Sequence, residues 1–579
     1  MPMDGMAWHG MAWHGMREDR RADGGGGDTD VLRAAETSSS LEVCGGVGRA
    51  RVSWRAGPRD VEEEHTKTPC KKAPDSGPVP AWISGSVYRQ SGGAFLDDAP
   101  TAFLDGLAHI SAYHFDNGAV TYSNKFMRTA MYDTFVKTGR RTWGGTATAP
   151  STGPSMIEQT WQKIKALFGS SSGPVYSSFN PNVNTVLLSD GTGAGGLRLA
   201  ASTENDGTAC EFDPVTLDTL GAAPRLAKTK DTVITTAAHY FVDPETHGGF
   251  HVSLDLDWHM SGVKPKFTFS YVLWHGASPP YREVGRHELT TFRWGEADRC
   301  SVKERAAYMH SMAQTENYVV LFLSSKRVCY EQLLKRDFSR GFFGLFQSVE
   351  TPLEFMVFRI KDKRSLALEY VDTIACPAPD CYMVWHLANC FEDDEGCIVI
   401  DAAASKNAKH DASDALVMKE PHTVMNFRIN LVARTAHVRE LCSGSPQQYE
   451  FPNINPRFHM KPNRHIFALE FPLVPGAGIV HIKRDAPPHE APRRLEGFKS
   501  TEIAGEPVFV PRPGSTDELD GVVLVEVLDV EKNSSRLLIC VATEENFRVE
   551  ASIEAPIPGN IGLHSTWVDH ASTQLAAKF

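Results

Sequence analysis

The fold class is indicated by a run of branched aliphatic residues, Val522-Val-Leu-Val-Glu-Val-Leu-Asp529. Residues of this kind favour β-strands, because their side chains pack well on a pleated surface. Similar short runs recur along the chain, and segments rich in Gly, Pro, Asn and Asp separate them. Many short strands between turns predict an all-β sandwich, barrel or propeller, and composition alone does not choose among these. The other runs are Val186-Leu-Leu-Ser-Asp-Gly191, Tyr318-Val-Val-Leu-Phe-Leu323 and Cys397-Ile-Val-Ile-Asp401.

Composition narrows the class of protein. The chain has 579 residues, of which 41% are hydrophobic, so it can bury a large core. Its net charge of −12 disfavours a nucleic-acid partner. No run of eighteen apolar residues is present, so we expect no membrane-spanning segment. The eleven cysteines are scattered without a zinc or redox spacing, which favours reduced thiols and an intracellular location, either cytoplasmic or peripheral on a membrane.

The N-terminal segment differs in texture from the rest of the chain. Residues 1–76 are rich in Gly, Arg, Asp and Glu and have no hydrophobic periodicity. This composition predicts a disordered extension, followed by one folded domain over residues 77–579. The segment has no apolar core of a secretory signal. A plastid transit peptide is an alternative that its acidic residues disfavour.

Two apolar segments are candidates for contact with a membrane. Residues 155–168 are predicted to form a helix, which begins at the capping pair Ser155 and Glu158 and ends at Gly169. Residues 338–346 hold several large apolar side chains next to cations. Each segment could instead pack on the protein, but flanking cations in both favour an interfacial role. The expected membrane contacts are Ile157, Trp161, Ile164, Phe168, Phe342, Phe343 and Phe346.

Four histidines far apart in the sequence are candidate metal ligands. Four neutral imidazoles that converge on one point would make a transition-metal site, and imidazole suits iron, zinc, copper and nickel alike. The spacing excludes a single helix or a zinc finger. It suits ligands that come from different repeat units of a large closed fold. The local contexts are Ala237-Ala-His239-Tyr-Phe-Val-Asp-Pro, Tyr308-Met-His310-Ser-Met, Val384-Trp-His386-Leu and Gly562-Leu-His564-Ser-Thr-Trp567.

In these four contexts the chain resembles the carotenoid cleavage oxygenases, a family of non-haem iron enzymes. The resemblance begins near Pro78, in Pro78-Val-Pro-Ala-Trp-Ile-Ser-Gly85, and runs to the C-terminus. Leu104-Asp-Gly-Leu-Ala108 is similar to the animal branch of β-carotene oxygenases and retinoid isomerohydrolases. The resemblance implies a seven-bladed β-propeller with a helical or loop cap over one face. It also implies one Fe(II) per chain, bound by His239, His310, His386 and His564.

The family also places three glutamates behind the ligands. Metal-bound imidazoles commonly donate their second N–H to a carboxylate, which fixes the tautomer and raises ligand basicity. The matching contexts here are Ser202-Thr-Glu204, Tyr449-Glu450-Phe-Pro and Gly505-Glu506-Pro-Val. The resemblance implies that Glu204 supports His310, that Glu450 supports His386 and that Glu506 supports His564. It implies no glutamate for His239.

The resemblance predicts a dioxygenase that cleaves a C=C double bond of a carotenoid or apocarotenoid with O₂, giving aldehyde or ketone products. Its partners would be the apolar polyene, O₂ and a membrane surface, which the animal branch contacts at the two segments above. Three alternatives stay open: retinoid isomerohydrolysis at the same iron, stilbene cleavage, and a non-catalytic propeller scaffold. Stilbene cleavage is disfavoured because Met131 occupies the position where those relatives have a lysine.

Overall fold

The computed structural model has two compact units, Met1–Arg55 and Ala56–Phe579. In the first unit, β1 (Ser40–Glu42) pairs with β2 (Arg51–Ser53) in an antiparallel hairpin. The structure describes residues 40–42, 51–53, 61, 63–94, 106–138, 180–182, 184–190, 197–204, 209–222, 232–239, 248–259, 261–272, 281–289, 292–293, 305–329, 346–377, 381–406, 422–445, 447–471, 473–487, 489–560, 562 and 564–570.

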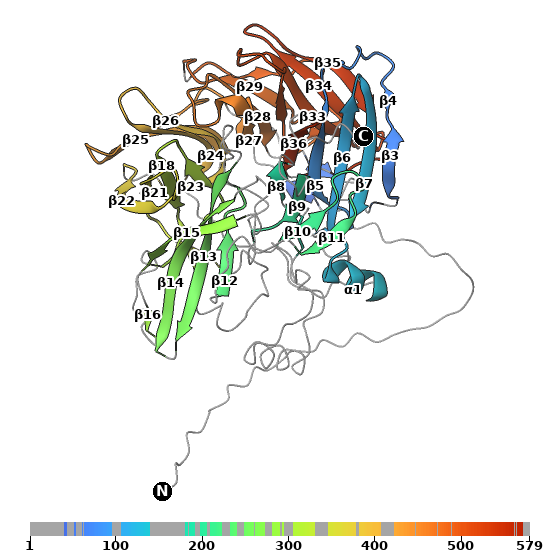
Figure 1. Ribbon diagram of the computed structural model, residues 1–579. Coiled ribbons are helices and arrows are strands. Elements are labelled where there is room, and N and C mark those ends of the chain that lie inside the picture. Colours follow the sequence, from blue (N-terminus) through green and yellow to red (C-terminus); the bar gives the residue numbers. More distant parts are fainter. Residues whose placement is uncertain are drawn as a thin grey trace, which may run out of the picture. The chain divides into compact units, whose positions relative to one another are not determined.

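Within the second unit, the described strands form seven antiparallel sheets, which are the blades of a β-propeller, and one separate two-stranded pair (Figure 1). Consecutive chain segments build consecutive blades, and the innermost strands of neighbouring blades contact one another. For example, β17 (Met312–Gln314) contacts β23 (Tyr382–Glu392), and β23 contacts β27 (Gln448–Asn453). This confirms the seven-bladed propeller that the family resemblance implies. Among the described residues, no helix is long and apolar enough to cross a bilayer.

The blades are numbered along the chain, beginning with the blade that contains the first and the last strand of the propeller. The strands of each blade are named from the innermost outward. Blade 1 contains β36 (Ser565–Asp569), β5 (Gly85–Gly92), β6 (Ala108–Asp116), β7 (Ala119–Phe126) and β3 (His65–Pro69). Blade 2 contains β8 (Asn184–Asp190), β9 (Leu197–Ser202), β10 (Ala209–Phe212) and β11 (Thr219–Ala222). Blade 3 contains β12 (Thr232–Thr236), β13 (Gly249–His259), β14 (Gly262–Val272) and β15 (Tyr281–Glu288), with β16 (Phe292–Arg293) beside β14. Blade 4 contains β17 (Met312–Gln314), β18 (Tyr318–Leu323), β21 (Glu354–Ile360) and β22 (Leu368–Ala375).

The strands of the remaining three blades are also named from the innermost outward. Blade 5 contains β23 (Tyr382–Glu392), β24 (Ile398–Lys406), β25 (His422–Asn430) and β26 (Thr435–Glu440). Blade 6 contains β27 (Gln448–Asn453), β28 (His465–Phe471), β29 (Ile479–Lys483) and β30 (Arg493–Arg494). Blade 7 contains β31 (Glu502–Ala504) and β32 (Val508–Pro511), both on β33 (Gly521–Asp529), then β34 (Ser534–Ala542), β35 (Phe547–Glu554) and β4 (Lys71–Lys72). The shorter described elements are the β19 (Lys326–Val328) and β20 (Phe346–Ser348) pair, α1 (Ala130–Thr138) and the 3₁₀ turn η5 (Pro456–Phe458).

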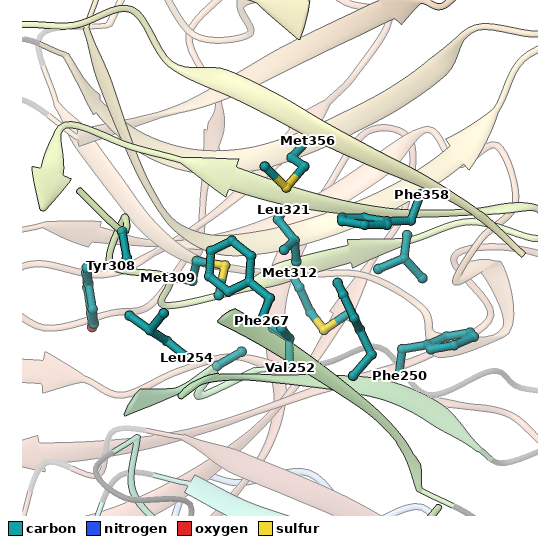
Figure 2. Packing of buried hydrophobic residues seen from close by; sticks show 14 of the residues in the cluster. Phe250, Val252, Leu254, Phe267, Tyr308, Met309, Met312, Leu321, Met356 and Phe358 are labelled. Carbon is teal, nitrogen blue, oxygen red and sulfur yellow. The ribbon is translucent and has the colours of Figure 1, made fainter. Parts of the chain in front are cut away.

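The core lies in layers between neighbouring blades. One layer joins blades 3 and 4, where Phe250 and Phe267 face Leu321, Met356 and Phe358 (Figure 2). Because the inner strands of a blade are covered on both faces by neighbouring blades, they are buried along their length instead of on alternate residues. In β33, every residue from Gly521 to Val527 is buried. This two-sided burial explains the unbroken aliphatic runs in the sequence.

The ring closes by pairing segments from the two ends of the propeller. β36, near the C-terminus, pairs with β5, and β4 pairs with β35 of blade 7. β3 also joins a blade, as the outer neighbour of β7. The structure therefore differs from the expected boundary at residues 76 and 77: residues 65–69 and 71–72 are strands of blades 1 and 7, because backbone pairing recruits a segment with no apolar pattern.

A close contact at this closure gives a testable prediction. Gly85 pairs with Asp569, and a Cβ at Gly85 would lie 2.1 Å from a ring carbon of Trp567 and 2.7 Å from the Val568 carbonyl oxygen. We expect Gly85→Ala to lower the free energy of unfolding by about 1–3 kcal/mol, measured by urea denaturation. Gly285→Ala is the matched control, since its Cβ would meet only Leu368 at 3.8 Å. Equal stabilities for the two variants would contradict this account.

Candidate metal centre

The propeller brings together the four histidines that the sequence predicts as metal ligands. One ligand atom from each of His239, His310, His386 and His564 lies within 4.8 Å of the others. The Nε2 atoms of His310 and His386 are 3.1 Å apart. Nitrogens bound to one transition-metal ion at about 2.1 Å and near a right angle would be about 3 Å apart, so this spacing suits a shared ion.

Each histidine comes from the innermost part of a different blade. His239 follows β12 of blade 3, His310 precedes β17 of blade 4, His386 lies in β23 of blade 5, and His564 precedes β36 of blade 1. Innermost strands converge toward the centre of the ring, so residues distant in sequence meet there. Backbone contacts fix the positions: the Ala238 amide donates to the His310 carbonyl at 2.8 Å.

Three glutamates contact three of these histidines in the pairs that the resemblance implies. His310 Nδ1 lies 3.1 Å from Glu204 Oε2, His386 Nδ1 lies 2.7 Å from Glu450 Oε2, and His564 Nδ1 lies 3.3 Å from Glu506 Oε1. An Nδ1–H that donates to a carboxylate leaves the lone pair on Nε2 free for a metal. The contacts therefore select the ligand-competent tautomer at three positions.

Burial favours the neutral form of His239, His386 and His564. Desolvation, reinforced by the neighbouring imidazoles, holds the pKa of His239 well below its ordinary value. Desolvation also lowers the pKa of His386 to about 4 and that of His564 to about 3. Neutral imidazole is the form that binds a metal. His239 Nε2 is buried and has no hydrogen-bond partner among the described residues, as expected of a lone pair directed at an ion.

The carboxylates differ in their electrostatics. Burial alone would raise the pKa of Glu450, but His386 and His422 outweigh it and hold that pKa well below its usual range. Burial raises the pKa of Glu506 to about 7, although the Ser565 amide donates to its Oε2 at 2.7 Å and opposes this shift. Glu450 is therefore a buried anion, and Glu506 is balanced between its two forms near neutral pH.

Sequence reasoning missed two residues that support this centre. His422 donates from Nδ1 to Glu450 Oε1 at 2.8 Å, and a lone histidine at the start of a strand gives no signal of such a role. Arg89 lies in the opening strand that carries the family resemblance, yet only the fold shows its contacts. Its guanidinium donates to Glu526 at 2.8 Å, to Ser565 Oγ at 3.0 Å and to the Glu506 carbonyl at 3.2 Å.

Aromatic rings surround the imidazoles. Phe451 stacks on His386 with ring centroids 4.6 Å apart, and Trp385 meets the edge of His310 at 5.2 Å. Tyr308, buried beside them, donates its hydroxyl to Glu204. These rings exclude water, which strengthens the electrostatic interactions between the buried groups.

The predicted membrane contacts fall mostly outside the described residues. Residues 155–168, Phe342 and Phe343 all lie in segments that the structure leaves undescribed. Phe346, the one described member, is 8% exposed and packs 4.7 Å from the ring of Tyr308. The expectation is wrong for Phe346, because its ring belongs to the core layer between blades 3 and 4.

Comparison with known proteins shows the family of this chain and agrees with its fold. The family model described as RPE65, retinal pigment epithelial membrane protein, matches residues 59–569. The chain belongs to this family. A carotenoid dioxygenase of Neurospora crassa is 24% identical over 86% of this chain and 88% of its own length. The β,β-carotene 15,15′-dioxygenase of Rattus norvegicus is 23% identical over 86% of this chain and 89% of its own length.

Solved structures of relatives share the fold. Cobalt-substituted ACO, the apocarotenoid oxygenase of Synechocystis, has a TM-score of 0.66 at 20% identity and covers 89% of this chain and 98% of its own. An ACO/RPE65 chimera has a TM-score of 0.65 at 20% identity with the same coverage. The family resemblance and the propeller expected from the sequence are thereby confirmed.

The centre predicts metal-dependent stability. A divalent ion such as cobalt(II), at a free concentration 100-fold above its Kd, should stabilise the metal-free protein by about 2.7 kcal/mol. We expect His239→Ala to remove most of this increase, measured as the shift in thermal unfolding with and without the ion. His109→Ala is the control, since His109 is a buried histidine of β6 in blade 1, outside the cluster. It should lower the starting stability but keep the shift, and a shift retained in full by His239→Ala would exclude that residue from the site.

Proposed function

We propose that this protein is a carotenoid or apocarotenoid cleavage dioxygenase that uses one Fe(II) bound by His239, His310, His386 and His564. The observation that carries the proposal is the convergence of four histidine side chains, three of which contact carboxylates. The family and its carotenoid dioxygenase members support it. Imidazole is a good ligand for iron, although the donor set alone suits other metals.

Bound Fe(II) would supply the redox chemistry that allows O₂ to react with an electron-rich double bond. The ligands are all neutral, so they leave the ion its full charge, unlike a site with two histidines and a carboxylate. Glu204, Glu450 and Glu506 would act one step behind them. Each accepts the Nδ1 proton of its histidine and so directs Nε2 toward the ion.

The surroundings of the centre suit an apolar substrate. Phe451 and Trp385 line the imidazoles with hydrocarbon, and a polyene has no polar group that would need a partner there. The protein would then act chiefly by holding one double bond beside the ion. An apolar polyene and O₂ are thus the proposed partners of this site.

The activity test compares the reactions that the same centre could perform. We expect the iron-loaded protein to consume O₂ in step with aldehyde or ketone formation from a panel of carotenoids and apocarotenoids, followed by mass spectrometry. His564→Ala should abolish the reaction, and Glu204→Gln should slow it by about 10- to 100-fold while the fold is kept. Retinyl ester isomerisation without O₂ consumption would support the isomerohydrolase instead. Cleavage of stilbenes alone would support a stilbene-cleaving oxygenase. An absence of bound iron would support a non-catalytic scaffold.

We also propose that the protein is intracellular and docks peripherally on a membrane through residues 155–168 and 338–345. The sequence supports this: Trp161 and Phe343 lie in apolar segments that also carry Lys163, Lys165 and Arg340. Apolar side chains would enter the interface, while the cations would be attracted to anionic headgroups. Direct transfer from the bilayer would spare a polyene from crossing water.

Membrane docking predicts a loss of liposome binding. Trp161→Glu combined with Phe343→Glu removes two side chains that contribute about 1.5–3 kcal/mol each when fully buried. The double variant should no longer sediment with liposomes that contain anionic lipid, and its iron content should stay unchanged. Phe346→Leu is the control, because this ring lies in the core. Sedimentation of the double variant at the wild-type level would refute docking through these segments.

A further inference from the structure

Glu450 differs from the other two glutamates in having a second imidazole as a partner. Its Oε2 accepts from His386 Nδ1 at 2.7 Å and from the Phe451 amide at 2.8 Å. Its Oε1 accepts from His422 Nδ1 at 2.8 Å. The side chains of Glu450 and His422 are both fully buried. The carboxylate thus lies between a proposed metal ligand and a histidine that is not part of the four-histidine cluster.

The three carboxylates share one arrangement, in which each has a donor besides its ligand histidine. Tyr308 donates its hydroxyl to Glu204, and the Ser565 amide donates to Glu506. His422 is the corresponding additional donor to Glu450. A buried carboxylate oxygen without a donor is costly, so it would take up a proton or rotate toward another donor. Either change would weaken the hydrogen bond that holds His386.

His422 is itself held firmly in place. It is the first residue of β25, in the same blade as His386 but separated from β23 by β24. Its ring stacks with Trp385 at a centroid distance of 6.3 Å and meets Phe471 at 5.7 Å. Packing from neighbouring rings restricts the rotamer, so Nδ1 stays directed at Glu450.

We propose that His422 is a positioning residue for the metal centre, which acts through Glu450 to fix the tautomer and direction of His386. The inference rests on the proposed function, since it assumes that His386 binds a metal. It adds a third layer to the centre, in the order His386, Glu450, His422. His422 touches no reacting atom, so its contribution is to ligand geometry and not to the chemistry.

A double-mutant cycle tests the proposal with cobalt(II) as the probe ion. Affinity is measured by competition with a chelator, and the visible absorption of cobalt reports the ligand geometry. His422→Leu keeps the side-chain volume close but removes the donor, and it should weaken cobalt binding about tenfold, at the lower end for residues behind a ligand. His422→Asn places an amide N–H near the position of Nδ1 and should restore most of the affinity and the wild-type spectrum.

Combining His422→Leu with a second substitution shows whether its effect on cobalt affinity is transmitted through Glu450. In the Glu450→Gln variant, adding His422→Leu should weaken cobalt binding by less than about another twofold. The reason is that the effects of residues that act through one another are not additive. In the Glu506→Gln variant, adding His422→Leu should weaken cobalt binding by the full factor of about ten. His481→Leu is the control for losing a buried imidazole: His481 bonds to His465 at 2.9 Å in blade 6, and its loss should leave cobalt affinity unchanged.

The outcomes separate the inference from the proposed function. Full additivity with Glu450→Gln, or an equal loss in His481→Leu, would overturn the role of His422. An unchanged affinity in His422→Leu would do the same. If the wild-type protein binds neither cobalt nor iron, the proposed function fails first, and the thermal unfolding of the metal-free variants shows whether they are folded.

Discussion

Closure of the ring between β36 and β5 is the constraint on which the rest of the structure depends. It joins segments from the two ends of the propeller in one blade and so completes the circle of innermost strands. His564 immediately precedes β36, and its carbonyl accepts from the Gln90 amide on β5 at 3.1 Å. Without this pairing, β36 would be detached from blade 1, and the fourth imidazole would not be held beside the other three. Closure and metal-site assembly are therefore one structural event.

Near that closure, a buried arginine is hydrogen-bonded to a carboxylate and to other polar groups. Arg89, on β5, spans to Glu526 in blade 7 and also contacts Ser565 and the backbone of Glu506. A Cβ at Gly505 would lie 2.4 Å from a guanidinium nitrogen of Arg89, and a Cβ at Gly562 would lie 2.2 Å from Cδ of the same side chain. A buried ion pair of this kind contributes little net stability, but losing one partner leaves an uncompensated charge. Arg89 thus connects Glu526 of blade 7 to the backbone of Glu506 and to Ser565, the residue that follows His564.

The centre combines two opposite demands on its electrostatics. The imidazoles must stay neutral, and burial lowers the pKa of His239, His386 and His564 to ensure it. The carboxylate of Glu450 must stay charged in the same desolvated place, and the imidazoles of His386 and His422 supply the hydrogen bonds that allow it. Each need is met by the same contact, because an Nδ1–H that donates to a carboxylate stabilises the anion and fixes the neutral tautomer together. A metal ion would then add a positive charge to a site in which three of the four ligand histidines contact a carboxylate.

The sequence by itself determined the fold class, the family and the residues of the centre. Runs such as Val522–Asp529 reported strands buried on both faces, and the motifs around His239, His310, His386 and His564 carried the family resemblance. These signals are local, so they can be read from the chain. The pairing of β3 and β4 with distant strands, the core position of Phe346, and the contacts of Arg89 and His422 were decided by tertiary structure alone. A lone lysine-rich strand, phenylalanine, arginine or histidine has many stable environments, and only the packing of blades around a closed ring selects one of them.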